Sequence, residues 1–87
     1  METICGSVAS ERLDSVLSVV FSGSRSKLAE LIEGKKVFVN SRLEESASYL
    51  LKPQDVVSVR GYGKFIFQEI TGMTKKGRKM VSVRKYR

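Results

Sequence analysis

Two cations stand at the predicted start of a helix. Residues 24–27 read Ser-Arg-Ser-Lys, and the apolar spacing after them predicts a helix that carries Arg25 and Lys27 in its first turn. The aligned peptide dipoles already place about half a positive charge there, so these cations do not help the helix. Ser24 is a suitable N-cap, and the other free N–H groups of the turn point outward. This arrangement is typical of an anion site, for which a nucleic-acid phosphate is the simplest ligand.

The net charge of the chain favours an anion site over a plain solvated surface. The formal charge is +7, histidine is absent from the sequence, and residues 61–87 hold eight basic side chains against one acidic. Such a patch attracts polyanions and speeds their association. The alternative is that Arg25 and Lys27 pair with Glu30 or Asp14 on the surface, where ion pairs contribute only about 0.2–0.5 kcal/mol.

A second group of cations falls at predicted strand ends and turns, where long side chains reach outward: Lys35, Lys36, Arg42, Arg60 and Lys64. Between Arg60 and Lys64 stand two glycines, which allow a phosphate to approach the backbone closely. A flexible connection between strands is an equally good interpretation of these glycines. Tyr62 between them is either a base-stacking ring or an ordinary surface or core residue.

A third group of cations follows in a predicted hairpin loop: Lys75, Lys76, Arg78 and Lys79. Charge runs of this kind are usually solvated, but this run lies in the most basic third of the chain. Non-specific contact with phosphates is therefore as good an interpretation as plain solvation.

The residues that enzymes use for catalysis are scarce. The sequence has no histidine and one cysteine, Cys5, and its adjacent acids Glu44 and Glu45 have no obvious cleft. We therefore expect neither an enzyme nor a metal or cofactor site. With 41% hydrophobic residues and no apolar run of about 18 residues, the chain is expected to be globular and cytoplasmic, without a membrane span.

Two short helices must position the first cations. Apolar residues from Leu13 to Phe21 recur at helical spacing, which predicts a helix from Glu11 to about residue 23. A second helix is predicted over residues 25–33, with Gly34 supplying the left-handed residue after it. We expect Arg12 to emerge on the side where the second helix begins.

After Gly34 the apolar period changes from 3.6 to 2, which predicts strands over residues 37–39, 56–59, 64–70 and 79–84, after an edge strand over residues 3–8. Tight turns are predicted at residues 40–41 and 52–55, and a long basic loop containing Gly72 and Gly77 joins the last two strands. Helices followed by strands indicate an α+β fold.

The predicted core lies between the helices and the sheet. Its members are Leu13, Val16, Leu17, Val20, Leu28, Leu31, Ile32, Val37, Val39, Val57 and Val59. Because a chain of this size buries little surface, we expect Leu31→Ala to threaten folding outright.

These residues resemble the S4 RNA-binding domain, a family named after a small-subunit ribosomal protein. The resemblance rests on Arg12-Leu13-Asp14, Ser24 to Lys27, Leu31-Ile32, Gly34, Val37 to Asn40 and Asp55 to Gly61. The flanks, residues 6–10 and 61–65 with the basic hairpin, look like the C-terminal S4 domain of bacterial YlmH-like RNA-binding proteins. Ser41 and Gln54 depart from the family pattern, which often has glycine at these turn positions.

The resemblance implies an S4-type fold in which two packed helices lie on a small, mostly antiparallel sheet with an added C-terminal β-hairpin. It implies a single domain over residues 1–87, with a core at about residues 11–61, inside a longer protein. It also implies RNA contact at Arg12, Ser24, Arg25, Ser26, Lys27, Asn40, Arg60 and Gly61.

The expected function is non-catalytic recognition of structured RNA, either ribosomal RNA or ribosome-bound transfer RNA. The protein is expected to be a monomer that associates with the ribosome. Two alternatives stay open at this point. One is a protein-interaction module whose basic face docks an acidic partner, and the other is the targeting domain of an RNA-modifying enzyme such as a pseudouridine synthase.

Overall fold

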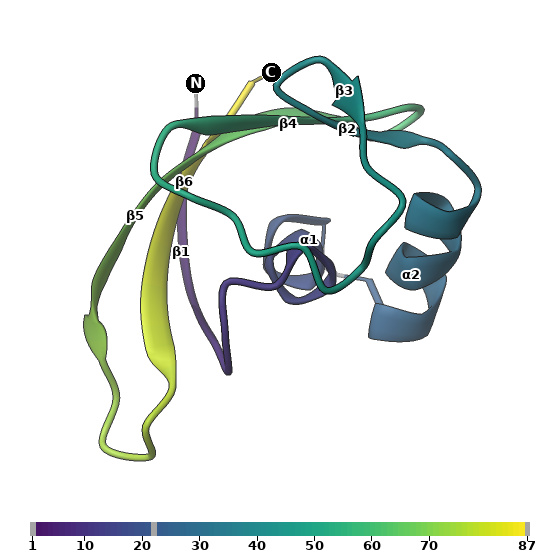
Figure 1. Ribbon diagram of the computed structural model, residues 1–87. Coiled ribbons are helices and arrows are strands. Elements are labelled where there is room, and N and C mark those ends of the chain that lie inside the picture. Colours follow the sequence, from purple (N-terminus) through teal and green to yellow (C-terminus); the bar gives the residue numbers. More distant parts are fainter. Residues whose placement is uncertain (1, 22, 87) are drawn as a thin grey trace.

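The computed structural model describes residues 2–21 and 23–86. Within this part of the chain, the helices α1 (Leu13–Phe21) and α2 (Arg25–Glu33) lie on the concave side of one six-stranded sheet (Figure 1). The strands are β1 (Glu2–Val8), β2 (Val37–Val39), β3 (Arg42–Leu43), β4 (Asp55–Val59), β5 (Gly63–Met73) and β6 (Lys79–Lys85). Their order is β1-β6-β5-β4-β2-β3, with antiparallel neighbours throughout. The predicted α+β fold is confirmed.

The two ends of the chain meet in the sheet. β1 pairs with β6 over its whole length, from Glu2 opposite Lys85 to Val8 opposite Lys79. The predicted edge strand at residues 3–8 is therefore confirmed, and β6 is its partner. β1 also packs closely on α1, because a Cβ atom at Gly6 would lie 2.6 Å from Cγ1 of Val19.

The last hairpin has longer strands and a shorter loop than predicted. Gly72 pairs with Met80 inside the ladder, so the prediction that it lies in the loop is wrong. Gly77, with φ of 81°, does lie in the loop as predicted. Two register shifts in β5 let the ladder continue past Ile70, where the sequence alternation no longer marks a strand.

The helix ends differ from the predictions in one respect each. α1 begins two residues later than predicted. α2 has the predicted bounds, but Gly34 has φ of −78° and the left-handed residue is Lys35, with φ of 62°. The helical pattern continues through Gly34, whose N–H donates to the carbonyl of Glu30 at 2.8 Å. The chain therefore turns one residue later, and the prediction for Gly34 is wrong.

The turns at residues 40–41 and 52–55 form as predicted without the glycines that the family often has. Asn40 and Ser41, with φ of 51° and 68°, make a two-residue connection between β2 and β3. The N–H of Asp55 donates to the carbonyl of Lys52 at 3.0 Å, and Gln54 has φ of 75°, which is the type II arrangement. Both turns keep their backbone geometry, although non-glycine residues then occupy the left-handed region.

The core lies where predicted, with one exception. Leu31 is only partly buried at the margin of the core, so Leu31→Ala is expected to cost less than predicted. The other predicted members are buried, and six further residues join them: Val8, Leu51, Phe65, Phe67, Val81 and Val83. Both phenylalanines come from β5, so the last hairpin belongs to the core rather than being an addition to it.

Candidate nucleic-acid interface

The start of α2 has the predicted cap. The hydroxyl of Ser24 accepts the N–H of Lys27 at 3.2 Å, and the first turn holds no acidic residue. Ser26 and Lys27 are exposed, while the side chain of Arg25 lies outside the described part of the structure. Among the described residues, no carboxylate lies within 4.0 Å of the Lys27 ammonium. This end of α2 therefore combines a capped helix start with an unneutralised cation.

Arg12 lies just before α1, at the end of that helix opposite to the link to α2. The prediction that Arg12 emerges on the side where α2 begins stays a prediction. Its Nε and Nη2 atoms lie 3.2 Å from the Oδ1 and Oδ2 atoms of Asp14. The RNA contact predicted for Arg12 stays a prediction, and any such contact competes with this ion pair.

The amino end of α1 is closed by the protein itself. The N–H of Leu13 donates to the carbonyl of Tyr49 at 2.8 Å, and that of Asp14 donates to the carbonyl of Ala47 at 3.2 Å. The N–H of Ser15 donates to the Asp14 carboxylate at 2.8 Å. Because these donors are used internally, the start of α1 does not have the open anion site that is predicted for the start of α2.

Two of the predicted turn cations meet at the far end of α2. The N–H of Arg60 donates to the carbonyl of Lys36 at 2.9 Å, where β2 begins and β4 ends. Lys35 precedes this pair and Gly61 follows it, both with positive φ and both exposed. The structure thus brings Lys35, Lys36, Arg60 and Gly61 together from two segments that are distant in the sequence.

Aromatic rings connect this turn to the end of α1. Tyr62 stands edge-on to Phe21, the last residue of α1, with centroids 5.6 Å apart. The Lys85 ammonium lies 5.1 Å from the same Phe21 ring, and the Lys64 ammonium lies 4.9 Å from the ring of Tyr86. Sequence reasoning missed Lys85 and Tyr86. Lys85 ends β6 and Tyr86 follows it, opposite the beginning of the predicted strand of residues 64–70, and this pairing was the available signal.

The side chain of Asn40 is engaged inside the protein. Its Nδ2 donates to Asp55 at 3.0 Å, and its Oδ1 accepts the N–H of Val56 at 2.9 Å, which ties the β2–β3 turn to β4. The RNA contact predicted for Asn40 stays a prediction. Arg42 is exposed and lines a pocket beside this turn.

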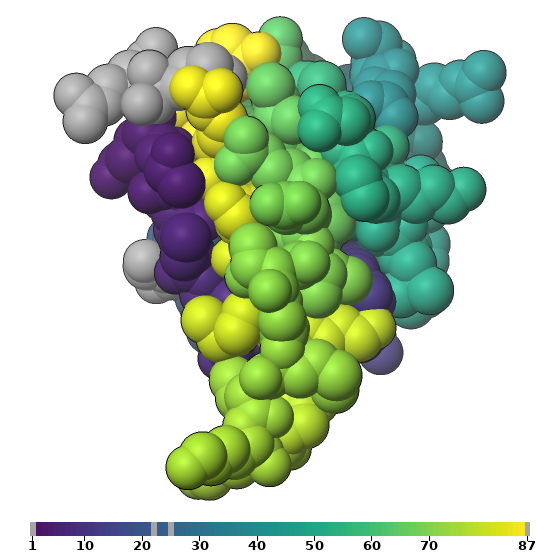
Figure 2. Space-filling view, turned by 90° about the vertical axis from the view of Figure 1, so that its left-hand side faces the viewer, coloured from purple at the N-terminus to yellow at the C-terminus, as the bar shows by residue number. Residues whose placement is uncertain are grey.

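The basic hairpin divides into two pairs of cations. Arg78 donates through Nη2 to the carbonyl of Ser7 at 3.0 Å, and Lys79 forms an ion pair with Glu11. This hydrogen bond from Lys79 holds the pKa of Glu11 below its ordinary value. Lys75 and Lys76 stay exposed near the tip, on the arm that projects from the molecule in Figure 2.

The described residues offer little for other chemistry. Across residues 2–21 and 23–86, no three acidic or cysteine side chains gather into a potential metal site. Neither α1 nor α2 has the length and apolar content that a bilayer crossing needs.

Comparison with known proteins identifies the family of this chain. The family model described as the S4 domain matches residues 11–57, which run from just before α1 into β4. The chain belongs to the S4 domain family. This confirms the family that the residues resemble, and it supports an RNA-binding role.

Two relatives cover different shares of this S4 chain. The ribosome-associated protein quality control protein P2 of Bacillus subtilis is 38% identical over 69 residues, which are 79% of this chain and 27% of that protein. The small ribosomal subunit protein uS4 of Chromohalobacter salexigens is 44% identical over 54 residues, 61% of this chain and 26% of that protein. The chain thus spans about a quarter of the length of the curated relatives it matches. The first relative fits the resemblance to YlmH-like proteins.

Proposed function

We propose that this chain is a non-catalytic module that binds structured RNA of the ribosome in the bacterial cytoplasm, as part of a longer protein. Ribosomal RNA and ribosome-bound transfer RNA are the candidate targets. Both similar proteins are ribosomal or ribosome-associated by name, which supports this proposal. The observation that carries it is a surface of cations, most of them exposed, that have no acidic partner among the described residues.

The cationic surface that we propose consists of Lys27 at the start of α2, Lys36 and Arg60 beyond its other end, and Lys85 with Tyr62. Contacts already described join Lys36 to Arg60 through the backbone, and Tyr62 to Lys85 through Phe21. Among the described residues, none of these cations lies within 4.0 Å of a carboxylate. Unpaired cations on a fixed frame suit phosphates along an RNA backbone.

Recognition by backbone and shape follows from the geometry of RNA helices. The deep major groove of A-form RNA hides its base edges from side chains, so proteins contact phosphates and 2′-hydroxyl groups instead. The cationic surface offers an ammonium group at the start of α2 and ammonium and guanidinium groups beyond its other end, and the helix itself is about 13 Å long. We expect about four to six phosphate contacts, and hence an affinity that falls steeply with salt.

Charge reversal tests the surface. We expect Lys36→Glu and Arg60→Glu each to weaken binding to purified ribosomal RNA about tenfold and to reduce the slope of log K against log[salt] by about one. Fluorescence anisotropy at several salt concentrations measures both quantities, and circular dichroism verifies the fold. Lys52→Glu is the matched control, because Lys52 is exposed and stands outside the cationic surface.

The proposal fails if the salt slope of the unchanged chain is near zero, or if all three variants behave alike. Transfer RNA as competitor separates the two candidate targets. An acidic protein partner would instead be retained by the chain in a pull-down after nuclease digestion, whereas partners held through RNA would be lost.

A further inference from the structure

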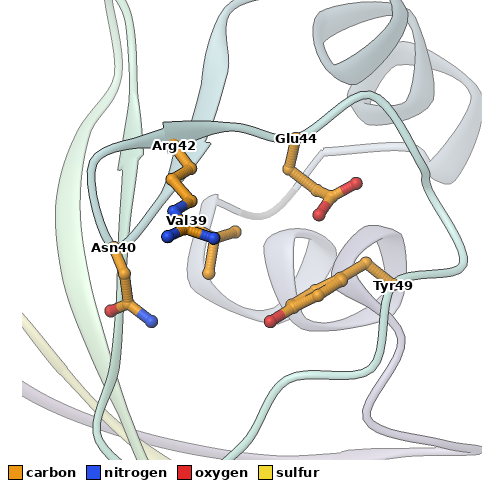
Figure 3. Close-up of a pocket in the computed structure, with 5 residues that line it drawn as sticks. All are labelled: Val39, Asn40, Arg42, Glu44 and Tyr49. Carbon is orange, nitrogen blue, oxygen red and sulfur yellow. The ribbon is translucent and has the colours of Figure 1, made fainter.

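A pocket of about 440 Å³ opens between the β2–β3 hairpin and the segment after it (Figure 3). Val39, Asn40, Arg42, Glu44 and Tyr49 line it. Figure 3 shows the side chains of Arg42 and Glu44 on one side of this space and the ring of Tyr49 on the other. Glu44 and Tyr49 take no part in the cationic surface, so the pocket calls for an explanation of its own.

Hydrogen bonds hold the backbone of Glu44 and Tyr49 and the carboxylate of Glu44. The N–H of Glu44 donates to the carbonyl of Val37 at 3.0 Å, and its carboxylate accepts the N–H of Ser46 through Oε2 at 3.1 Å. Tyr49 donates its N–H to the carbonyl of Ser46 at 3.2 Å and accepts from Leu13, at the start of α1. A ligand therefore meets a carboxylate that is already placed, which lowers the entropic cost of binding.

The charges in the pocket do not suit a phosphate. Among the described residues, no cation lies within 4.0 Å of the Glu44 carboxylate, so its negative charge is not neutralised by Arg42. Burial raises the pKa of Tyr49, assisted by the negative charges of Asp55 and Glu44, so its hydroxyl stays protonated. A carboxylate, a guanidinium and a half-buried ring together suit a flat polar group that carries both N–H donors and acceptors.

We propose that this pocket receives an unstacked guanine base of the bound RNA. Guanine presents two adjacent donors, N1–H and the 2-amino group, that a carboxylate such as that of Glu44 accepts, and it presents O6 and N7 to a guanidinium such as that of Arg42. The ring of Tyr49 offers a stacking surface. The inference rests on the proposed function, because the base belongs to the RNA held by the cationic surface.

The other bases fit these groups less well. Adenine turns the N1 acceptor toward the carboxylate, and uracil presents one N–H between two carbonyl groups. Cytosine has a single amino donor beside an acceptor. A carboxylate that accepts two adjacent donors binds a base poorly when that base leaves one of its oxygens without a hydrogen bond. A good bidentate contact changes the affinity for the right base over the wrong one by about fivefold or more.

The test is a titration of the 87-residue chain with guanosine, inosine and adenosine monophosphates, followed by NMR. Guanosine monophosphate is expected to shift the amides of residues 39–44 and 49 and to bind about fivefold or more tightly than adenosine monophosphate. Inosine monophosphate lacks the 2-amino group and is expected to fall between them. Equal affinities, or shifts confined to other residues, would overturn the inference.

A variant pair assigns the preference to one side chain. Glu44→Gln keeps the shape and an acceptor for Ser46 but removes the second acceptor and the charge, so the preference for guanosine monophosphate is expected to disappear. Glu45→Gln makes the same chemical change at the neighbouring exposed residue and is expected to leave the preference intact. Loss of the preference in both variants would contradict a role for Glu44.

Measuring the binding of ribosomal RNA distinguishes a failure of this inference from a failure of the proposed RNA-binding function. If the salt-dependent affinity persists but no guanine preference is found, the pocket proposal fails and the RNA-binding function stands. If ribosomal RNA does not bind at all, the function fails, and with it the assignment of the pocket to an RNA base.

Discussion

Several residues of this chain hold backbone conformations that their side chains disfavour. Lys35, Ser41 and Gln54 all have φ between 62° and 75°, in the left-handed region that glycine occupies freely. For other residues this region costs about 1–2 kcal/mol, because the Cβ atom crowds the following carbonyl. Each of these positions ends a helix or reverses a strand, so the surrounding hydrogen bonds determine the conformation.

Relief of this strain at Gln54 should stabilise the fold. Gln54 is exposed, and its N–H donates to the carbonyl of Phe67 at 2.7 Å, a bond that glycine keeps. We expect Gln54→Gly to raise the free energy of unfolding by up to about 1 kcal/mol, since the relieved strain exceeds the added entropy of the unfolded chain. Urea denaturation measures this change.

The control for this variant is Gln54→Ala, which removes the same side chain but keeps a Cβ atom. It is expected to be no more stable than the unchanged chain. A stabilisation of equal size in both variants would show that the side chain, and not the backbone angle, causes the effect.

At the scale of elements, the β5–β6 hairpin is anchored to the beginning of the chain. Lys79 pairs with Glu11 just before α1, and Arg78 donates to Ser7 in β1. These contacts engage two of the four hairpin cations for which the sequence predicts phosphate contact. They also fix the root of the hairpin while Lys75 and Lys76 remain exposed.

The Glu11 anchor should make stability depend on pH. The hydrogen bond from Lys79 lowers the pKa of Glu11 from its ordinary value of about 4.5, so the folded state favours the charged carboxylate. The stabilisation is therefore present in full above pH 4.5 or so and is lost as the pH falls through the lower, folded-state pKa. We expect the unchanged chain to exceed Glu11→Gln in stability near neutral pH.

Thermal unfolding of the unchanged chain and of Glu11→Gln between pH 3 and pH 7 measures this. The difference in stability between the two proteins is expected to shrink toward acid pH. Glu45→Gln serves as the control, because Glu45 is exposed and has no ion pair in the described structure. A difference that is constant across the range would contradict the assigned titration.

At the scale of the whole molecule, the domain is larger than its family match. The S4 model ends at residue 57, but the buried residues Phe65, Phe67, Val81 and Val83 lie beyond it in β5 and β6. β1 completes the sheet from the other end of the chain by pairing with β6. The core is thus shared between the matched segment and both of its flanks.

A shortened chain tests this dependence. We expect residues 10–61 alone to lack a cooperative unfolding transition, because the cut exposes the paired edge of β4 and removes two buried phenylalanines from the core. Circular dichroism and NMR dispersion, compared with the full chain, measure this. A cooperative transition in the short chain would show that the flanks are dispensable.

Much of the fold followed from local patterns. The bounds of α2, the Ser24 cap and the β2–β3 turn were predictable because each depends on residues within a few positions of one another. The register shifts of β5 and the left-handed Lys35 were not, because they depend on how an element continues against its neighbours. The candidate site likewise has a part that local patterns predicted and a part that they did not.

The sequence by itself determined the charge, the family and which cations are available, because these depend only on residue types and their spacing. Only the tertiary structure decided which distant residues these cations meet. It paired Lys79 with Glu11, and it joined Lys36 to Arg60 across two strands. The same folding set Glu44 opposite Tyr49 in a pocket. Lys79 and Glu11 are distant along the chain, as are Lys36 and Arg60, so the distance in space between the members of each pair is fixed only when the sheet closes.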